Sequence, residues 1–232
     1  MKKLSIIIPV YNEASTISEI IKRVKAADSL GLEKEIIVVN DASTDATNEK
    51  LESESGIIVE KHWRNKGKGA ALKTGFKKAT GDIVLIQDAD FEYNPNEYPI
   101  MLKSILEGRA DVVFGSRFIT GEPHRVLFFY HYLGNLFITF LSNLFTNLNL
   151  SDIETCYKVF RKEVIDSILP KLQSNRFGIE VELTARVAKG KWRVYEVGIS
   201  YSGRTYEEGK KINWKDGIAA IFHIIRFNIF SR

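Results

Sequence analysis

The chain has 232 residues, with 33 Lys and Arg against 29 Asp and Glu, so its formal net charge is +4. Its composition, 44% hydrophobic and 27% charged, excludes a disordered or fibrous chain and is compatible with one or at most two domains. So small a positive charge does not indicate a nucleic-acid partner, and a lone cysteine, Cys156, excludes an internal disulfide framework.

The first half of the chain alternates between short apolar runs and stretches with helical spacing. Residues 4–10 read as a buried strand and not as a signal peptide, because the run turns polar at once and lacks a small-residue cleavage site. In chain order we expect strand 4–10, helix 14–30, strand 35–40, helix 43–54, strand 56–59, helix 69–79, strand 82–87 and strand 110–114. This alternation predicts an α/β fold with a mostly parallel, doubly wound sheet that binds ligands at the carboxyl ends of its strands.

Polar residues follow these strands. They are Tyr11, Asn12 and Glu13 after the first, Asn40 and Asp41 after the second, Asp88, Asp90 and Glu92 after the fourth, and Ser116 and Arg117 after the fifth. Carboxylates after three neighbouring strands would converge on one crevice. That arrangement is costly unless a cation, a sugar or a base is bound there.

The segment 87–90, Gln-Asp-Ala-Asp, is the most informative motif. Asp88 and Asp90 flank one small residue and could hold a divalent ion together with phosphate oxygens and water. An isolated pair of this kind also occurs in ordinary strand-ending turns. Its position after the fourth predicted strand favours the metal site.

The segment 40–45, Asn-Asp-Ala-Ser-Thr-Asp, combines a structural and a functional interpretation. Ser43 or Thr44 would cap the following helix. Asp41, at the end of the strand, could instead accept hydrogen bonds from a base or a ribose. The two interpretations use different residues, so both can hold.

A basic, glycine-containing segment opens the third predicted helix. Residues 65–71 match neither a Walker loop nor a dinucleotide fingerprint. They suit a diphosphate at a helix N-terminus or a mobile closing loop, or else a plain turn whose glycines serve the backbone. Seven basic residues and no acidic one lie in this region: Lys61, Arg64, Lys66, Lys68, Lys73, Lys77 and Lys78.

Two amphipathic stretches lie in the second half. Residues 126–151 contain no Asp, Glu, Lys or Arg, and place an uncharged polar stripe opposite a broad aromatic-rich face. A helix in a membrane interface, or at an oligomer contact, fits this pattern better than a core helix, and a core helix fits better than a membrane span. Residues 218–230 are too short to span and would form a second surface helix or a docking C-terminal helix.

Charged residues near the C-terminal end supply further candidates. Glu180 and Glu182 open a helix that runs to residue 188, where they either complement the helix dipole or act as a base or sugar-hydroxyl acceptor. Arg204 and Lys210 follow the predicted strand 192–200. They are either solvated or form a phosphate clamp.

Taken in order, these motifs resemble family 2 glycosyltransferases of the GT-A fold, in the dolichyl- or polyprenyl-phosphate hexosyltransferase branch. The motifs are VYNE, NDASTD, residues 65–69, QDAD, GSRF, ETCYK, residues 178–182 and RTYEEGKK. The resemblance covers nearly the whole chain and implies one domain, 1–232. Its nucleotide-sugar half would be 1–117, and its acceptor half 118–232 would carry amphipathic helices over 126–150 and 213–230.

The resemblance implies an inverting, metal-dependent transfer of a hexose, mannose or glucose, from a donor of the GDP-mannose or UDP-glucose type to a polyprenyl phosphate. It implies roles for individual residues. Pro9, Tyr11, Glu13 and Asp41 would line the nucleotide pocket, with Asn40, Lys68 and Ala89; Asp88, Asp90 and Glu92 would hold Mg²⁺ or Mn²⁺; and Arg117, Arg204 and Lys210 would bind phosphates. The sequence reads NDAS where DDGS is commoner, so Asn40 departs from the family pattern.

We expect a peripheral protein at the cytoplasmic face of a membrane, held by residues 126–151 and 218–230, and leave homo-oligomerisation open. The Q-x-x-R-W signature of processive synthases is absent, which argues against a chain-building enzyme. A phosphate acceptor is already ionised and needs no strong base. Two alternatives remain: a saccharide or protein hydroxyl acceptor with Glu180 or Glu182 as base, and a catalytically silent scaffold that binds nucleotide and membrane.

Overall fold

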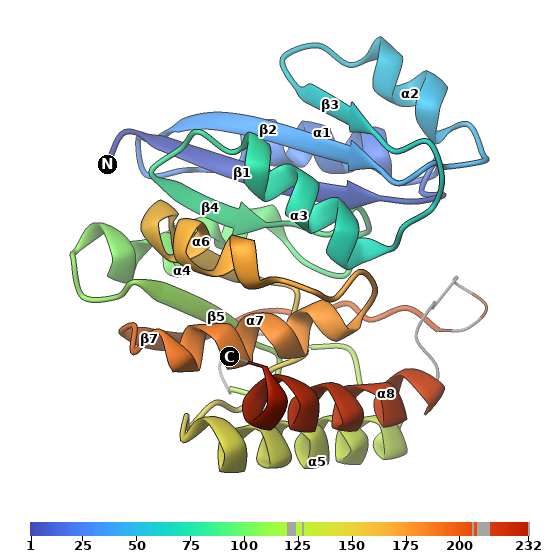
Figure 1. The fold of residues 1–232 in the computed structure, drawn as a ribbon. Helices are drawn as coiled ribbons and strands as arrows, with labels where there is room; N and C mark the ends of the chain where they lie inside the picture. Colours follow the sequence, from blue (N-terminus) through green and yellow to red (C-terminus); the bar gives the residue numbers. More distant parts are fainter. Residues whose placement is uncertain (120–123, 127, 206, 208–213, 232) are drawn as a thin grey trace.

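The computed structural model describes residues 1–119, 124–126, 128–205, 207 and 214–231, and within that part of the chain seven strands form one sheet (Figure 1). Their order is β3-β2-β1-β4-β6-β5-β7. The strands are β1 (Lys3–Val10), β2 (Glu33–Asn40), β3 (Ile58–Lys61), β4 (Ile83–Ile86), β5 (Val112–Ser116), β6 (Lys158–Arg161) and β7 (Val194–Gly198).

Helices cover both faces of the sheet. They are α1 (Ile17–Ala26), α2 (Thr47–Ser53), α3 (Lys68–Lys78), α4 (Tyr98–Leu106), α5 (Phe129–Thr146), α6 (Lys162–Ile168), α7 (Gly178–Lys189) and α8 (Trp214–Ile225), with short turns η1 (Pro95–Glu97), η2 (Leu169–Lys171) and η3 (Arg226–Phe230). In Figure 1, α3, α6 and α7 lie in front of the sheet, and α1 and α4 lie behind it. The helices α5 and α8 run side by side at the lower end.

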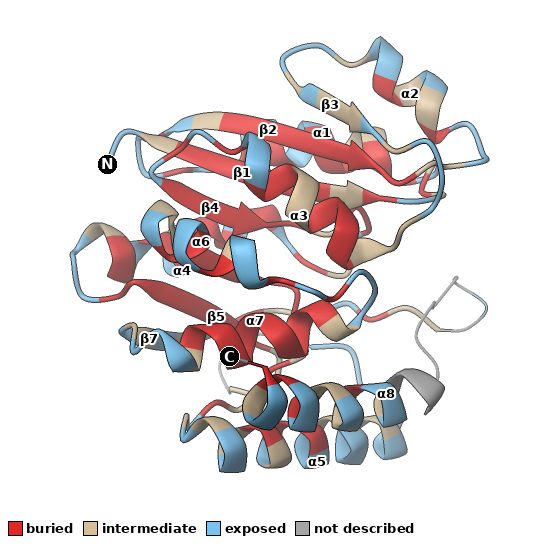
Figure 2. Cartoon of the chain, in the orientation of Figure 1, coloured by how far each residue is buried: buried red, intermediate tan, exposed pale blue. Residues whose placement is uncertain are grey.

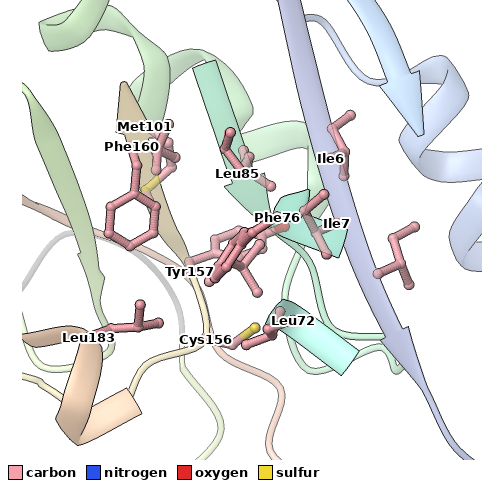
Figure 3. Packing of buried hydrophobic residues seen from close by; sticks show 14 of the residues in the cluster. Ile6, Ile7, Leu72, Phe76, Leu85, Met101, Cys156, Tyr157, Phe160 and Leu183 are labelled. Atoms are coloured by element: carbon pink, nitrogen blue, oxygen red, sulfur yellow. The ribbon is translucent and has the colours of Figure 1, made fainter. Parts of the chain in front are cut away.

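The central strands are buried on both faces. Figure 2 shows β1 largely buried. In β1, Leu4, Ile6 and Ile7 have no exposed surface, which explains why the sequence shows an apolar run and no alternation. Figure 3 shows side chains of β1 and α3, with Tyr157 just before β6, in the same cluster. The helix α3 packs so closely on β1 that a Cβ on Gly75 would lie 2.3 Å from Ile7 Cγ2.

The predicted fold class is confirmed, with one strand that the sequence analysis missed. Four pairings, β1 with β2 and β4, β2 with β3, and β5 with β7, are parallel, whereas β6 is antiparallel to both β4 and β5. The segment read only as the motif ETCYK thus leads into a strand. The helix expected over 43–54 begins at Thr47, because the Asp45 carboxylate accepts a hydrogen bond from the Thr47 amide at 3.0 Å.

The amphipathic helix α5 carries its polar side inward. Thr139 is 3% and Ser142 1% exposed, whereas Phe140 is 64% and Leu144 67% exposed. Figure 2 shows exposed surface along α5 and α8. No helix in the described ranges is both long enough and apolar enough to cross a bilayer. The exposed apolar side of α5 is the reverse of what a core helix of a globular domain presents to water.

Candidate active site

An open cavity of about 1730 Å³ lies where β1, β2 and β4 end, and it extends to α5 and α8. Its polar end is lined by Pro9, Tyr11, Glu13, Asp41, Lys68, Asp88, Ala89, Asp90, Glu92, Arg117, Glu180 and Arg204. Its other end is lined by residues of the two amphipathic helices, among them Phe129, Tyr132, Asn135 and Ala220. Charged groups and an apolar helix pair therefore share one continuous space.

Four carboxylates at the polar end of the cavity, those of Glu13, Asp88, Asp90 and Glu92, form an acidic cluster, and Arg204 is paired with it. Its Nη2 lies 2.5 Å from Asp90 Oδ2 and 3.3 Å from Glu13 Oε1. Burial, together with the carboxylates of Asp88 and Glu92, raises the pKa of Asp90 to about 7, although Arg204 acts against the rise. Burial and the neighbouring carboxylates together thus outweigh the guanidinium in setting this pKa.

A chain of alternating charges links the cavity to the interior. Lys68 Nζ lies 2.8 Å from Asp88 Oδ1 and 3.1 Å from Glu180 Oε1. The other oxygen of Glu180 accepts a 2.8 Å hydrogen bond from Lys158, whose side chain has no exposed surface. Lys158 also donates to the carbonyls of Ile153 and Thr155. Glu180 is thus shared between two lysines.

Arg117 is held by a buried carboxylate that the sequence analysis did not single out. Its Nε and Nη2 donate to the two oxygens of Asp152 at 2.6 and 2.8 Å. The guanidinium also lies 5.1 Å from the centre of the Tyr201 ring. The pairing fixes Arg117, which lines the cavity.

Asp41 lines the cavity, but its carboxylate also organises the loop before α3. It accepts hydrogen bonds from the amides of Lys66 and Gly67, at 2.9 and 2.6 Å, and lies 2.6 Å from Nδ1 of His62. Nε2 of His62 in turn lies 2.9 Å from Thr74 Oγ1. His62 was not predicted as a site residue, because nothing in the pattern around it distinguishes it from a surface residue.

Two of the predicted residues, Asn40 and Glu182, do not line the cavity, and a third is not described. Asn40 is buried, and its Oδ1 accepts a hydrogen bond from the Ser43 amide at 2.9 Å, so it closes a turn. Glu182 lies on the same helix as Glu180 but has no exposed surface and does not line the cavity. Lys210 lies outside the described residues.

The carboxylates at the polar end of the cavity are of the kind that binds divalent cations. Among the described residues no three Asp, Glu, His or Cys side chains already form a metal site. Asp88 and Asp90 nevertheless offer carboxylate oxygens, the ligands that Mg²⁺ and Mn²⁺ prefer, and protein cations now occupy them. The carboxylate of Glu92 accepts a 2.9 Å hydrogen bond from the backbone amide of Arg204.

Comparison with known proteins gives a consistent picture. The family model "Glycosyl transferase family 2" matches residues 5–169. The chain is 32% identical over 215 residues to a dolichol-phosphate mannosyltransferase of Pyrococcus furiosus, covering 90% of this chain and 59% of that protein. It is 30% identical over 217 residues to an undecaprenyl-phosphate 4-deoxy-4-formamido-L-arabinose transferase of Salmonella paratyphi A, covering 90% of this chain and 63% of that protein. It therefore spans about three fifths of either relative.

A solved structure shares the fold. Glucosyl-3-phosphoglycerate synthase of Mycobacterium tuberculosis, in complex with Mn²⁺, UDP and glucosyl-3-phosphoglycerate, superposes with a TM-score of 0.75. The match covers 98% of this chain and 80% of the synthase at 19% identity. The fold is that of GT-A glycosyltransferases.

Proposed function

This chain belongs to glycosyl transferase family 2 and is a glycosyltransferase, and we propose that it moves a hexose from a nucleotide-diphosphate sugar to a polyprenyl phosphate at a membrane surface. One observation carries the proposal: a single cavity joins the acidic and basic groups after β1 and β4 to the two amphipathic helices. A donor diphosphate needs charged groups, whereas an isoprenoid acceptor needs an apolar surface. The two must also lie in one cavity for the transfer to occur.

The polar end supports the donor side of the proposal. Asp88 and Asp90 would hold Mg²⁺ or Mn²⁺, which would supply positive charge to the leaving diphosphate. Lys68 and Arg204 lie beside these carboxylates and would stabilise the same phosphates. Pro9, Tyr11 and Asp41 line the wall in which the nucleoside would sit.

The end of the cavity at α5 and α8 supports the acceptor side of the proposal. Exposed apolar side chains there include Phe137, Phe140 and Leu144 of α5, Phe222 of α8 and Ile229 of η3. Exposed apolar side chains on a pair of adjacent helices are typical of helices that lie in a membrane interface. The two relatives named above carry dolichol phosphate and undecaprenyl phosphate in their names, which agrees with a lipid phosphate as acceptor.

The surroundings of Glu180 favour a phosphate acceptor over a hydroxyl. A hydroxyl acceptor needs a general base to remove its proton, and Glu180 is the carboxylate of α7 that reaches the cavity. Lys68 and Lys158 are paired with the two oxygens of this carboxylate, so a role as base would require one of these ion pairs to break. A phosphate oxygen is ionised near neutral pH and can attack without a base.

In the proposed reaction an acceptor phosphate oxygen attacks the anomeric carbon of the hexose from the face opposite the diphosphate. The new carbon–oxygen bond forms as the bond to the diphosphate breaks, and the nucleoside diphosphate leaves with the electron pair. A single displacement inverts the anomeric configuration. Arg117, fixed by Asp152, would orient the acceptor phosphate, and Arg204 and Lys68 would bind the leaving group.

The test is transfer in vitro. The purified chain is incubated with GDP-mannose or UDP-glucose, Mg²⁺ or Mn²⁺, and a short polyprenyl phosphate in phospholipid vesicles. We expect a lipid-linked hexose by mass spectrometry, with inverted configuration by NMR, and its loss in Asp90→Asn. Transfer to a saccharide or protein hydroxyl while the lipid phosphate stays unreacted would overturn the proposal.

A further inference from the structure

Glu182 holds the loop between η2 and α7. Its Oε2 accepts a 2.7 Å hydrogen bond from the Ser174 amide, and both oxygens accept from the Gln173 amide at 3.0 Å. Arg186, one turn along α7, lies 3.3 Å from Oε1. A buried carboxylate with several backbone donors fixes the backbone that it binds.

The same loop clamps the start of α3. The carbonyl of Asn175 accepts a 3.0 Å hydrogen bond from the Ala70 amide, and its side-chain Oδ1 accepts a 2.7 Å hydrogen bond from Lys73. The donors lie in the first two turns of α3, which opens with Lys68. The loop that Glu182 fixes is therefore in direct contact with the backbone that carries Lys68.

Two glycines make this contact close. A Cβ on Gly69 would lie 2.6 Å from the Ser174 carbonyl oxygen, and a Cβ on Gly67 would lie 2.5 Å from the carbonyl oxygen of Asn175. Gly67 also has a φ of +94°, a conformation that favours glycine. The glycines of this segment thus serve the approach of the 173–175 loop.

We propose that Glu182 is a positioning residue: through the 173–175 loop it sets the place of Lys68 beside Asp88 and Glu180. In this proposal Glu180 and Glu182 of α7 both position Lys68, each through a different contact. Glu180 contacts the Lys68 ammonium directly, and Glu182 fixes the 173–175 loop that contacts the backbone carrying Lys68. This inference rests on the proposed function, in which Lys68 binds the donor diphosphate.

The test is a double-mutant cycle on nucleoside diphosphate binding. Dissociation constants for GDP and UDP with Mn²⁺ are measured by calorimetry for wild type, Glu182→Gln, Lys68→Met and the double variant. We expect Glu182→Gln to weaken binding about tenfold in the wild type and to have almost no effect in the Lys68→Met background. A residue that acts only on global stability would give equal effects in both backgrounds.

Matched variants control for loss of fold. Glu35→Gln removes another buried carboxylate that accepts a backbone amide, that of Thr80 at 2.8 Å, and Glu35 does not line the cavity. It should leave nucleotide binding unchanged. If Glu182→Gln does not fold, Gly69→Ala is used in its place. The new Cβ would displace the 173–175 loop, while Glu180 and Glu182 stay unchanged. Gly81→Ala is its control, since that Cβ would meet the Ser5 amide at 2.7 Å, outside the cavity.

The outcomes separate the two proposals. If Lys68→Met binds nucleotide as tightly as wild type, the role of Lys68 in the proposed function is wrong. If Lys68→Met weakens binding but Glu182→Gln does not, or does so equally in both backgrounds, only the positioning role of Glu182 is overturned.

Discussion

The guanidinium of Arg204 lies against the carboxylate of Asp90, with 2.5 Å between Nη2 and Oδ2. The two residues are 114 positions apart in the chain and come from the segments after β7 and β4. Arg204 thus provides a positive charge at the oxygen atoms that we assign to a divalent ion. If the proposed ion binds there, the side chain and the ion would compete for the same carboxylate.

From this competition we expect Arg204→Gln to bind Mn²⁺ more tightly than wild type in the absence of nucleotide, by about tenfold. Turnover should fall in the same variant, because the leaving diphosphate loses a cation. Electron paramagnetic resonance of free Mn²⁺ measures the affinity. Arg193→Gln, which removes an arginine paired with Asp111 outside the cavity, is the control. Unchanged or weaker Mn²⁺ binding in Arg204→Gln would contradict the competition.

The Lys158–Glu180 pair makes a prediction about stability. Glu180→Gln leaves the fully buried ammonium of Lys158 without its carboxylate, and we expect a loss of about 3 kcal/mol in the free energy of unfolding. Lys158→Met in the same chain removes the unpaired charge and should restore part of that loss. Urea unfolding of the two single variants and the double variant measures it. Additive losses would show that the two charges do not stabilise each other.

The outward apolar side of α5 makes a prediction about membranes. Phe140→Glu and Leu144→Glu, together, should reduce binding to phospholipid vesicles by about tenfold or more, measured by sedimentation. Both side chains are exposed, so the free energy of unfolding should change by no more than about 0.5 kcal/mol each. Ile100→Glu, an exposed position on α4, is the matched control and should bind vesicles normally. Equal losses in all variants would argue against a specific face.

Glu35 makes a prediction about pH. Burial raises the pKa of its carboxyl, but hydrogen bonds from Lys3, Ser5 and Thr80 outweigh burial and lower the pKa from 4.5 to about 2. Between these values the unfolded chain binds more protons than the folded one, so the stabilisation is complete above pH 4.5 and is lost as the pH falls towards 2. Glu35→Gln should lower the unfolding free energy at pH 7 by about 2 kcal/mol and flatten this dependence, measured by urea titrations.

The sequence pattern predicts those features that depend on residues close together in the chain. The run around Ile6 and Ile7 predicts a central strand because a doubly covered strand needs apolar residues on both faces. The polar residues that follow β1 and β4 lie together, since parallel strands end at one edge. The strand β6 was missed. Its first residue, Lys158, is charged, and a buried lysine is acceptable there because the distant Glu180 offsets its charge.

Contacts between distant segments decide what individual side chains do. Glu180 and Glu182 stand two positions apart and have the same chemistry, yet one reaches the cavity and the other binds the 173–174 backbone. The pattern of α5 was read correctly as two-sided. Which side faces water follows from packing, because Asn143 bonds both the amide and the carbonyl of Leu150 and so ties the polar side to the body of the protein.

The inverted polarity of α5 has a consequence for kinetics. If the helix rests on lipid, enzyme and acceptor share a surface, and encounters between them depend on the number of acceptor molecules per unit of membrane area. Adding inert phospholipid at constant total acceptor would then slow transfer, although every bulk concentration of reactant is unchanged. A Michaelis constant for the acceptor would have to be expressed as a mole fraction of the bilayer, while the constant for the water-soluble donor stays molar.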